Sequence, residues 1–184
     1  MTTFNEKLQA KWDEGKFVCV GLDSELPKIP QACAQPFREF NEDKGVYEYI
    51  VRVTPDTISI FNESIVQVTK DLACVYKPNL AFYIAHGHKG LRALRRTIVD
   101  IHRIAPDVPV VLDAKDMDIG NTNTGYVKMA FEYCQADAIT VNPYLGMEAA
   151  QPFLDCKDKG IIVLCKTSNP GAGEFQDWDI SGDA

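Results

Sequence analysis

Five short, almost wholly apolar segments recur along the chain, and most are followed by a segment with helical periodicity. No other feature of the sequence constrains the fold as strongly. Segments that are apolar throughout, rather than alternating, are typical of buried strands in a parallel sheet covered by helices. The expected fold class is therefore α/β, with strands at residues 17–23, 73–77, 108–113, 137–141 and 161–165.

The intervening segments predict helices where apolar residues repeat every three or four positions. These helices are expected at residues 4–12, 46–70 with an interruption at Pro55, 91–101, 126–133 and 146–156. Residues 24–44 are rich in Pro, Gln and charge and predict a loop with a short helix around 37–40. Residues 166–175 also predict a loop, and residues 176–184 show no periodicity.

Two architectures fit this pattern, a doubly wound open sheet and a (β/α)8 TIM barrel. No G-x-G-x-x-G follows the first strand, so a dinucleotide-binding fold loses its best support. Polar residues gather at the C-terminal ends of the predicted strands, where a barrel places its active site and an open sheet also binds ligands. They are Asp23, Lys77, Asp113, Lys115, Asn142, Lys166 and Ser168.

A barrel needs eight strands and usually about 250 residues, whereas this chain has 184 residues and five predicted strands. We therefore expect a single barrel domain over residues 1–184, truncated at the C-terminus and containing only the first five or so β/α units. A truncated barrel leaves the edges of its sheet open.

Composition excludes several classes of function. A net charge of −7 argues against binding to nucleic acid or an anionic membrane. No apolar run reaches the length of a membrane span, and the charged N-terminus does not resemble a signal peptide. The six cysteines form no C-x-x-C pair, which predicts reduced, buried thiols in a cytoplasmic protein. His86 and His88 lack neighbouring ligands and are expected on an exposed loop, so no metal site is predicted.

The segment LDAKDMDIGNTNTG carries the clearest chemistry. Asp113 and Lys115 are two residues apart, which on a strand directs both side chains to one side. With Asp116 and Asp118 close by, Lys115 is expected to stay protonated. Such a lysine is a poor Schiff-base nucleophile but is well suited to deliver a proton to a carbanion. A solvated charged turn is the simpler reading, but Lys77 and the other strand-end residues favour one convergent site.

At this point the motifs resemble a known family, the orotidine 5'-monophosphate decarboxylases. LDAKDMDIGNT (112–122) resembles the family signature D-x-K-x-x-D-I, and VYKPNLAFY (75–83) resembles its second-strand lysine in the K-P-N form of the bacterial-type long branch. CVGLDS (19–24) resembles the first-strand aspartate, and TSNPGAG (167–173) resembles the loop after the fifth strand. The four motifs occur in the family's order and cover nearly the whole chain.

The resemblance implies a (β/α)8 barrel that works as a homodimer with shared active sites. The family converts orotidine 5'-monophosphate to uridine 5'-monophosphate, the last step of de novo pyrimidine biosynthesis, with no metal and no organic cofactor. It implies that Lys115 donates a proton to the pyrimidine carbanion, while Asp113 lies near the departing carboxylate. Asp118 is expected to reach into the partner's site and complete an alternating charge network with Lys77.

The remaining roles also follow from the resemblance. Asp23 and Lys77 are expected to hold ribose hydroxyls, and Thr122 to contact the ribose across the interface. Ile119, which follows Asp118 in the signature, is also expected to bind substrate, and Ser168 to hydrogen-bond the pyrimidine. The glutamine and arginine that hold the phosphate in this family are expected beyond Ala184.

Other interpretations stay open. Asp23 and Ser168 are ordinary turn residues, and Thr122 is an ordinary helix N-cap. A keto-sugar-phosphate decarboxylase of the same superfamily shares D-x-K-x-x-D, but it uses magnesium and carries a glutamate in place of Lys77. A non-catalytic barrel remnant, or a Schiff-base aldolase using Lys115 or Lys166, would also fit parts of the pattern.

Overall fold

Five parallel strands lie side by side in the computed structural model, which describes residues 2–178. β1 (Val18–Leu22) pairs with β4 (Ala73–Pro78), and β6 (Ala138–Val141) pairs with both β5 (Val111–Leu112) and β7 (Gly160–Val163). Isolated parallel bridges join β4 to the β5 region, so the strand order is β1-β4-β5-β6-β7. All five predicted strands are present, but the one expected at 108–113 is reduced to two residues flanked by isolated bridges at Val110 and Asp113, and the others shift slightly at their ends.

The sheet is open within residues 2–178, because β1 and β7 lie at its two edges and do not pair with each other. The described fold is therefore mixed α/β with a parallel sheet, and the closed eight-stranded barrel is not formed by this part of the chain.

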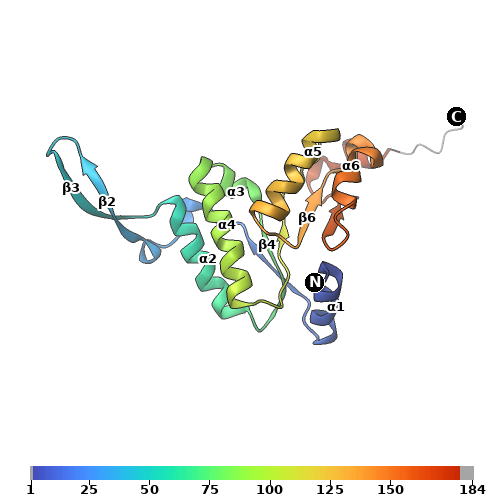
Figure 1. The fold of residues 1–184 in the computed structure, drawn as a ribbon, viewed down its shortest axis with the longest axis horizontal. Helices are drawn as coiled ribbons and strands as arrows, with labels where there is room; N and C mark the ends of the chain where they lie inside the picture. Colours follow the sequence, from blue (N-terminus) through green and yellow to red (C-terminus); the bar gives the residue numbers. More distant parts are fainter. Residues whose placement is uncertain (1, 179–184) are drawn as a thin grey trace, which may run out of the picture.

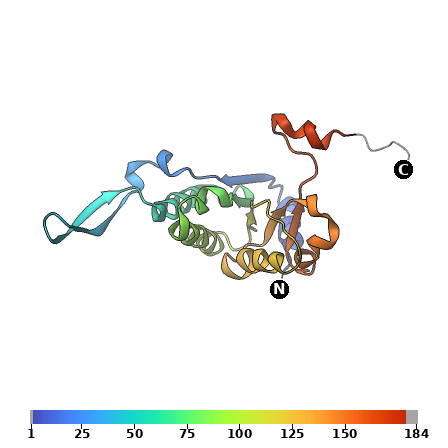
Figure 2. The same cartoon turned by 90° about the horizontal axis from the view of Figure 1, so that it is seen from above.

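The described chain contains seven α-helices: the first precedes β1 and packs on one face of the sheet, and the main core lies against the other face. The helices are α1 (Phe4–Asp13), α2 (Pro55–Thr69), α3 (Leu80–Ile84), α4 (Gly87–Ile104), α5 (Gly120–Val127), α6 (Gly146–Leu154) and α7 (Gly173–Gln176). Single helical turns lie at Leu26–Lys28, Gln31–Cys33, Pro143–Leu145 and Pro170–Ala172, and a π-helical turn (Lys128–Tyr133) extends α5. α2 and α4 pack side by side in both views (Figures 1 and 2). The main core forms where apolar residues of these helices, such as Leu94 and Ile98, meet the strands.

A second, smaller core lies on the other face of the sheet. Val111 and Ala138 alternate along their strands with residues of the main core, so they point the opposite way. Phe4 and Leu8 of α1 pack against them, and the Phe4 amide donates to the Asp158 carbonyl (3.0 Å) just before β7. α1 therefore ties the N-terminal ends of the strands together.

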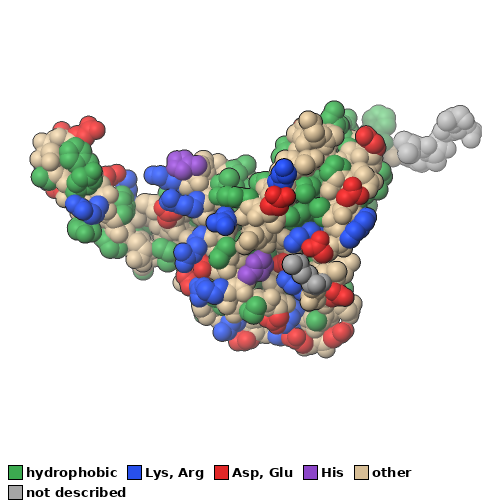
Figure 3. Space-filling model, viewed as in Figure 1, with side chains coloured by type: hydrophobic (Ala, Val, Ile, Leu, Met, Phe, Trp, Pro, Cys, Tyr) green, Lys and Arg blue, Asp and Glu red, His purple; other side chains and the backbone are tan. Residues whose placement is uncertain are grey.

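The segment between β1 and α2 differs from its prediction. Residues 35–52 form an antiparallel hairpin of β2 (Gln35–Asn41) and β3 (Val46–Arg52), not a loop followed by a helix. The segment is rich in aromatic and β-branched residues, which favour strands, and Gly45 takes the positive φ of 64° at the turn. The hairpin projects away from the helices and sheet (Figures 1 and 2) and carries exposed hydrophobic side chains (Figure 3).

The structure also bears on the cysteines, on His86 and His88, and on the loop predicted at residues 166–175. All six cysteines are free, but only Cys74 and Cys134 are buried, while Cys19 and Cys165 are exposed on strand surfaces or loops. His86 lies in the turn before α4, as its N-cap, whereas His88 lies in the first turn of α4 and is exposed, not on a loop. Short helical turns occupy much of the loop predicted at residues 166–175, and residues 179–184 lie outside the described part. None of the helices in residues 2–178 is both long and apolar enough to cross a membrane.

Candidate active site

Three charged side chains meet at the C-terminal edge of the sheet, with a carboxylate between two ammonium groups. Lys77 Nζ, near the end of β4, lies 2.6 Å from Asp113 Oδ2, and Lys115 Nζ lies 2.5 Å from Asp113 Oδ1. The Asp113 side chain is 6% exposed, whereas those of Lys77 and Lys115 are 34% and 48% exposed. The structure thus brings together three of the four residues expected to be catalytic, the fourth being Asp118, and both lysines are partly exposed.

Burial and hydrogen bonding shift the pKa values of Asp113 and Lys77 in opposite directions. Burial alone would raise the pKa of Asp113, but hydrogen bonds from Lys115, Lys77 and Thr140 outweigh it and lower that pKa. Burial likewise opposes the charge on Lys77, but the hydrogen bond and charge of Asp113 raise the pKa of Lys77 above its usual value. The cluster therefore holds Asp113 as an anion and Lys77 as a cation at neutral pH.

The position of Lys115 has a different cause from the one expected. β5 ends at Leu112, so strand alternation does not direct the Lys115 side chain. Instead, Lys115 takes the left-handed φ of 57°, and this turn brings its side chain back onto Asp113.

Asp23 lies beside this cluster, one strand away. It follows Leu22, which is in register with Pro78, and its Oδ2 accepts a long hydrogen bond from Asn79 Nδ2 (3.5 Å). Because the side chain of Asp23 is exposed, it remains accessible to a ligand at this edge.

A buried hydrogen-bonded ring fixes the chain on either side of Asp23. Ser24 Oγ donates to Asn62 Oδ1 (2.5 Å), Asn62 Nδ2 donates to the Tyr83 hydroxyl (2.8 Å), and that hydroxyl donates to the Leu22 carbonyl (3.2 Å). Burial raises the pKa of Tyr83, which keeps the phenol protonated as this ring requires. α2 and α3 thereby hold the end of β1 in place.

The loop carrying Asp118, Ile119 and Thr122 is held separately. Within the described residues, none of the three hydrogen-bonds to Lys77, Asp113 or Lys115. Asp118 Oδ1 accepts from the Ile119 amide (2.6 Å), while Ile119 is 59% exposed and Thr122 is also exposed. Thr122 is not the N-cap of α5, since Ile119 occupies that position.

Buried Asn123 fixes this loop and was missed in the sequence. Its Oδ1 accepts from the Asp118 amide (2.7 Å), and its Nδ2 donates to the carbonyls of Asp118 and Ala149 (2.6 Å to Ala149). Nearby, Thr122 and Asp116 line an apolar pocket with Leu80 and other residues of α3, α4 and α5. Burial raises the pKa of Asp116, which distinguishes it from Asp113.

Other strand-end residues do not join the charged cluster. Asn142 Oδ1 accepts from the Tyr144 amide (3.0 Å) and so caps a helical turn. Lys166 pairs with Asp177. Ser168 is exposed on the loop after β7 and makes no hydrogen bond within the described chain. Its predicted contact with the pyrimidine therefore stays a prediction.

Thr140 of β6 is the second residue that sequence reasoning missed. Its hydroxyl donates to Asp113 Oδ1 (2.9 Å) from inside a strand that otherwise reads as apolar. A lone hydroxyl near the end of a fully buried strand was the signal available, because a buried polar group needs a partner.

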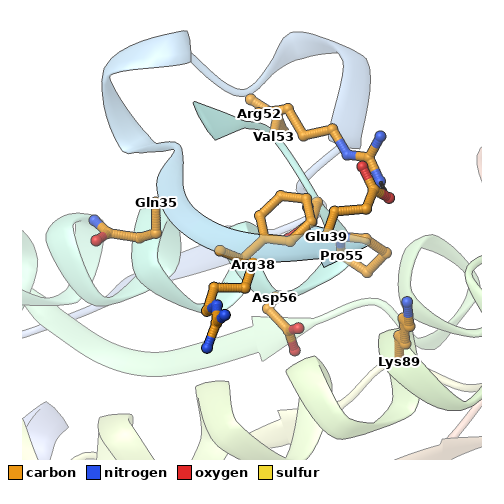
Figure 4. A pocket seen from close by; sticks show the side chains of 10 residues that line it. Gln35, Arg38, Glu39, Arg52, Val53, Pro55, Asp56 and Lys89 are labelled. Atoms are coloured by element: carbon orange, nitrogen blue, oxygen red, sulfur yellow. Dashed lines mark hydrogen bonds and ion pairs between the residues drawn. The ribbon is translucent and has the colours of Figure 1, made fainter. Parts of the chain in front are cut away.

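A separate hollow lies at the base of the hairpin. Figure 4 shows Arg38, Arg52 and Lys89 among its lining residues. Arg52 is already paired with Glu39 (2.7 Å). This hollow is formed by the hairpin, α2 and α4, and it shares no residue with the Lys77–Asp113–Lys115 cluster. No group of three or more His, Cys, Asp or Glu side chains in residues 2–178 is arranged to hold a metal ion.

Comparisons with known proteins show which family the chain resembles. Residues 17–183 match the model of the orotidine 5'-phosphate decarboxylase / HUMPS family. The chain is 40% identical over 179 residues to the orotidine 5'-phosphate decarboxylase of Thermomicrobium roseum, covering 97% of this chain and 56% of that protein. It is 38% identical over 181 residues to that of Cellvibrio japonicus, covering 98% and 60%.

Solved structures show the same likeness. The OMP decarboxylase of Leishmania donovani superposes with a TM-score of 0.79 at 30% identity, covering 98% of this chain and 60% of that one. The UMP synthase of the same organism gives a TM-score of 0.79 at 31% identity, covering 99% and 34%. The chain thus spans 56% and 60% of the two bacterial relatives it resembles.

Proposed function

The chain belongs to the orotidine 5'-phosphate decarboxylase / HUMPS family, and we propose that the full-length protein converts orotidine 5'-monophosphate to uridine 5'-monophosphate without a metal or organic cofactor. The single observation that carries this proposal is the alternation of Lys77, Asp113 and Lys115 at the C-terminal edge of the sheet. The proposed reaction is a step of pyrimidine biosynthesis.

In the proposed reaction, the bond between the pyrimidine ring and its carboxylate breaks. The electron pair stays on the ring carbon, and carbon dioxide leaves. Lys115 holds a proton in its ion pair with Asp113 and delivers it to the carbanion, after which the lysine is reprotonated from solvent. The cationic Lys77 and Lys115 stabilise the negative charge that develops on the ring.

Asp113 supports this chemistry by staying ionised. Its lowered pKa keeps a negative charge beside the site where the substrate carboxylate would lie. Two adjacent carboxylates repel each other, so loss of carbon dioxide relieves this repulsion. Asp23, at the end of β1, is well placed to accept hydrogen bonds from ribose hydroxyls.

The direct test is release of carbon dioxide from carboxyl-labelled orotidine 5'-monophosphate by the full-length protein in EDTA. We expect metal-independent turnover, and a decrease in kcat of about 10²- to 10⁴-fold in Lys115→Ala. Lys70→Ala is the matched control, because Lys70 follows α2 near the opposite end of β4. No turnover by the folded wild type would refute the proposal, and turnover only with magnesium would favour the keto-sugar-phosphate reaction.

We further propose that the active site is shared in a homodimer, with Asp118, Ile119 and Thr122 serving the partner's site. The proposal is supported by the exposure of Ile119 and Thr122 and by the absence, within residues 2–178, of hydrogen bonds from this loop to the charged cluster of the same chain.

Mixed dimers of Lys115→Ala and Asp118→Ala provide a sharp test. Each variant alone should be inactive. If sites are shared, one of the two sites in a mixed dimer contains both native residues, so mixing should restore up to half of the wild-type activity per mixed dimer. If each chain supplies both residues to its own site, mixing restores nothing.

A further inference from the structure

The hydroxyl of Thr140 makes three hydrogen bonds within the charged cluster. It donates to Asp113 Oδ1 (2.9 Å) and accepts from the backbone amides of Ala114 (3.0 Å) and Lys115 (3.0 Å). A hydroxyl has one proton and two acceptor lone pairs, so these three bonds exhaust its capacity. The residue is only 7% exposed, and water therefore does not readily replace these bonds.

The two amides belong to the turn that directs Lys115. A lysine at φ 57° lies in the left-handed region, which is unfavourable for an L-residue with a side chain. Thr140 binds the amide of that residue and the amide before it, and it therefore stabilises the conformation that returns the Lys115 ammonium to Asp113.

The third bond orients the carboxylate. Asp113 Oδ1 accepts from both Thr140 and Lys115, while Oδ2 accepts from Lys77. Without the hydroxyl, the hydrogen-bond donors that residues 2–178 offer to this carboxylate would be two flexible, partly exposed lysine side chains.

We propose that Thr140 is a positioning residue of the reaction, fixing the carboxylate of Asp113 and the turn at Lys115 in one arrangement. This inference rests on the decarboxylase function proposed above. Thr140 itself does not touch the reacting atoms; it acts through Asp113 and Lys115. A displacement of about 1 Å in such groups is enough to lower a rate by about 100-fold.

The test compares Thr140→Val with Thr140→Ser in the full-length protein. Valine keeps the shape of threonine and removes all three hydrogen bonds, whereas serine keeps the hydroxyl. We expect kcat to decrease about 10- to 100-fold in Thr140→Val with KM changed less than about threefold, and Thr140→Ser to recover to within about fivefold of wild type. The acidic limb of the kcat–pH profile should also move to higher pH in Thr140→Val.

Thr69→Val is the matched control, because it removes a partly buried hydroxyl that bonds to Tyr76 and the Ile65 carbonyl and, in the described residues, to no member of the charged cluster. It should leave kcat unchanged. Unaltered kcat in Thr140→Val, or a serine variant as slow as the valine variant, would overturn the inference. If Thr140→Val does not fold, Thr140→Cys, with its weak thiol donor, takes its place with the same expectation.

Hydrogen exchange at the Ala114 and Lys115 amides separates this inference from the proposed function. Both amides should exchange at least about 10-fold faster in Thr140→Val than in wild type or Thr140→Ser. If the wild type lacks turnover, the decarboxylase proposal falls, while equal exchange rates in all three proteins would independently refute a positioning role.

Discussion

Lys77 lies on β4 and Asp113 directly follows the neighbouring β5, and their charged atoms lie 2.6 Å apart at one edge of the sheet. We expect a double-mutant cycle of Lys77→Met and Asp113→Asn to give a coupling free energy of about 1 to 2 kcal/mol at pH 7, measured by urea unfolding. Additive single effects would contradict an energetically significant pair.

The stabilisation by the Lys77–Asp113 pair is expected to depend on pH. The pKa of Asp113 is lowered from 3.8, so its contribution is full above pH 3.8 and is lost as pH falls through the lower folded value. The pKa of Lys77 is raised from 10.5, so its contribution is full below pH 10.5 and is lost as pH rises through the higher folded value. The coupling measured in the cycle should be greatest between these limits.

Asp137 is expected to make the described fold sensitive to acid. Its carboxylate lies 2.7 Å from Lys7 Nζ and 3.0 Å from His102 Nε2, and it accepts from the Val110 amide (2.9 Å). Burial alone would raise the pKa of Asp137, but these hydrogen bonds outweigh it and lower the pKa to about 2. This contribution, about 2 kcal/mol, is full above pH 3.8 and is lost as pH falls towards 2.

Urea unfolding at pH 7, 4 and 2.5 should therefore show a smaller decrease in stability at low pH for Asp137→Asn than for wild type. Asp43→Asn, in the exposed turn of the hairpin, is the control and should behave like wild type. An acid response of Asp137→Asn equal to that of wild type would show that another group is responsible.

Gly160 is expected to tolerate no side chain. A Cβ at this position would lie 2.3 Å from the Phe4 ring and 2.7 Å from the Ala138 Cβ. Gly160→Ala should lower the free energy of unfolding by about 1 to 3 kcal/mol through overpacking. Adding Phe4→Leu should recover part of that loss, and thermal unfolding of both variants and their combination would measure it. A combined effect equal to the sum of the single effects would place the strain elsewhere.

Asn62 is expected to be essential to the end of β1. Asn62→Leu has similar volume but leaves the buried hydroxyls of Ser24 and Tyr83 without one partner each. We expect a loss of about 2 to 4 kcal/mol of unfolding free energy, measured by urea titration. Exposed Asn5 provides the control, and Asn5→Leu should change stability by less than about 0.5 kcal/mol. A comparably small effect at Asn62 would mean that the ring is not energetically important.

The elements that could be predicted are those in which the spacing of the apolar residues fits one kind of secondary structure. The five parallel strands read as continuous apolar runs, and Leu94, Ile98 and Ile101 mark the buried face of α4. The hairpin was misread because Val46, Ile50 and Val53 also fit helical spacing. The strong preference of its Tyr and Val residues for strands, together with the turn at Gly45, favours the hairpin instead.

For the site, the charged side chains could be predicted from the sequence, but the residues that hold them in position could not. Lys77, Asp113 and Lys115 could be identified because charged residues at the ends of apolar strands indicate a functional site. The left-handed turn at Lys115 leaves no mark in the sequence, since only glycine or asparagine usually signals one. Thr140 and Asn123 act through backbone groups and a carboxylate that come together only in three dimensions.

The packing of α1 against the beginning of β7 also has a consequence for biosynthesis. On the ribosome, the α1 segment emerges before every strand of the sheet, yet Phe4 reaches its partners at Asp158 and Gly160 only after β7 has been made. α1 also packs against Cys74 and Val75 of β4, which are made much earlier, so only part of its packing surface waits for β7. The packing of α1 is therefore completed in two stages, of which the second requires the last strand of the described sheet.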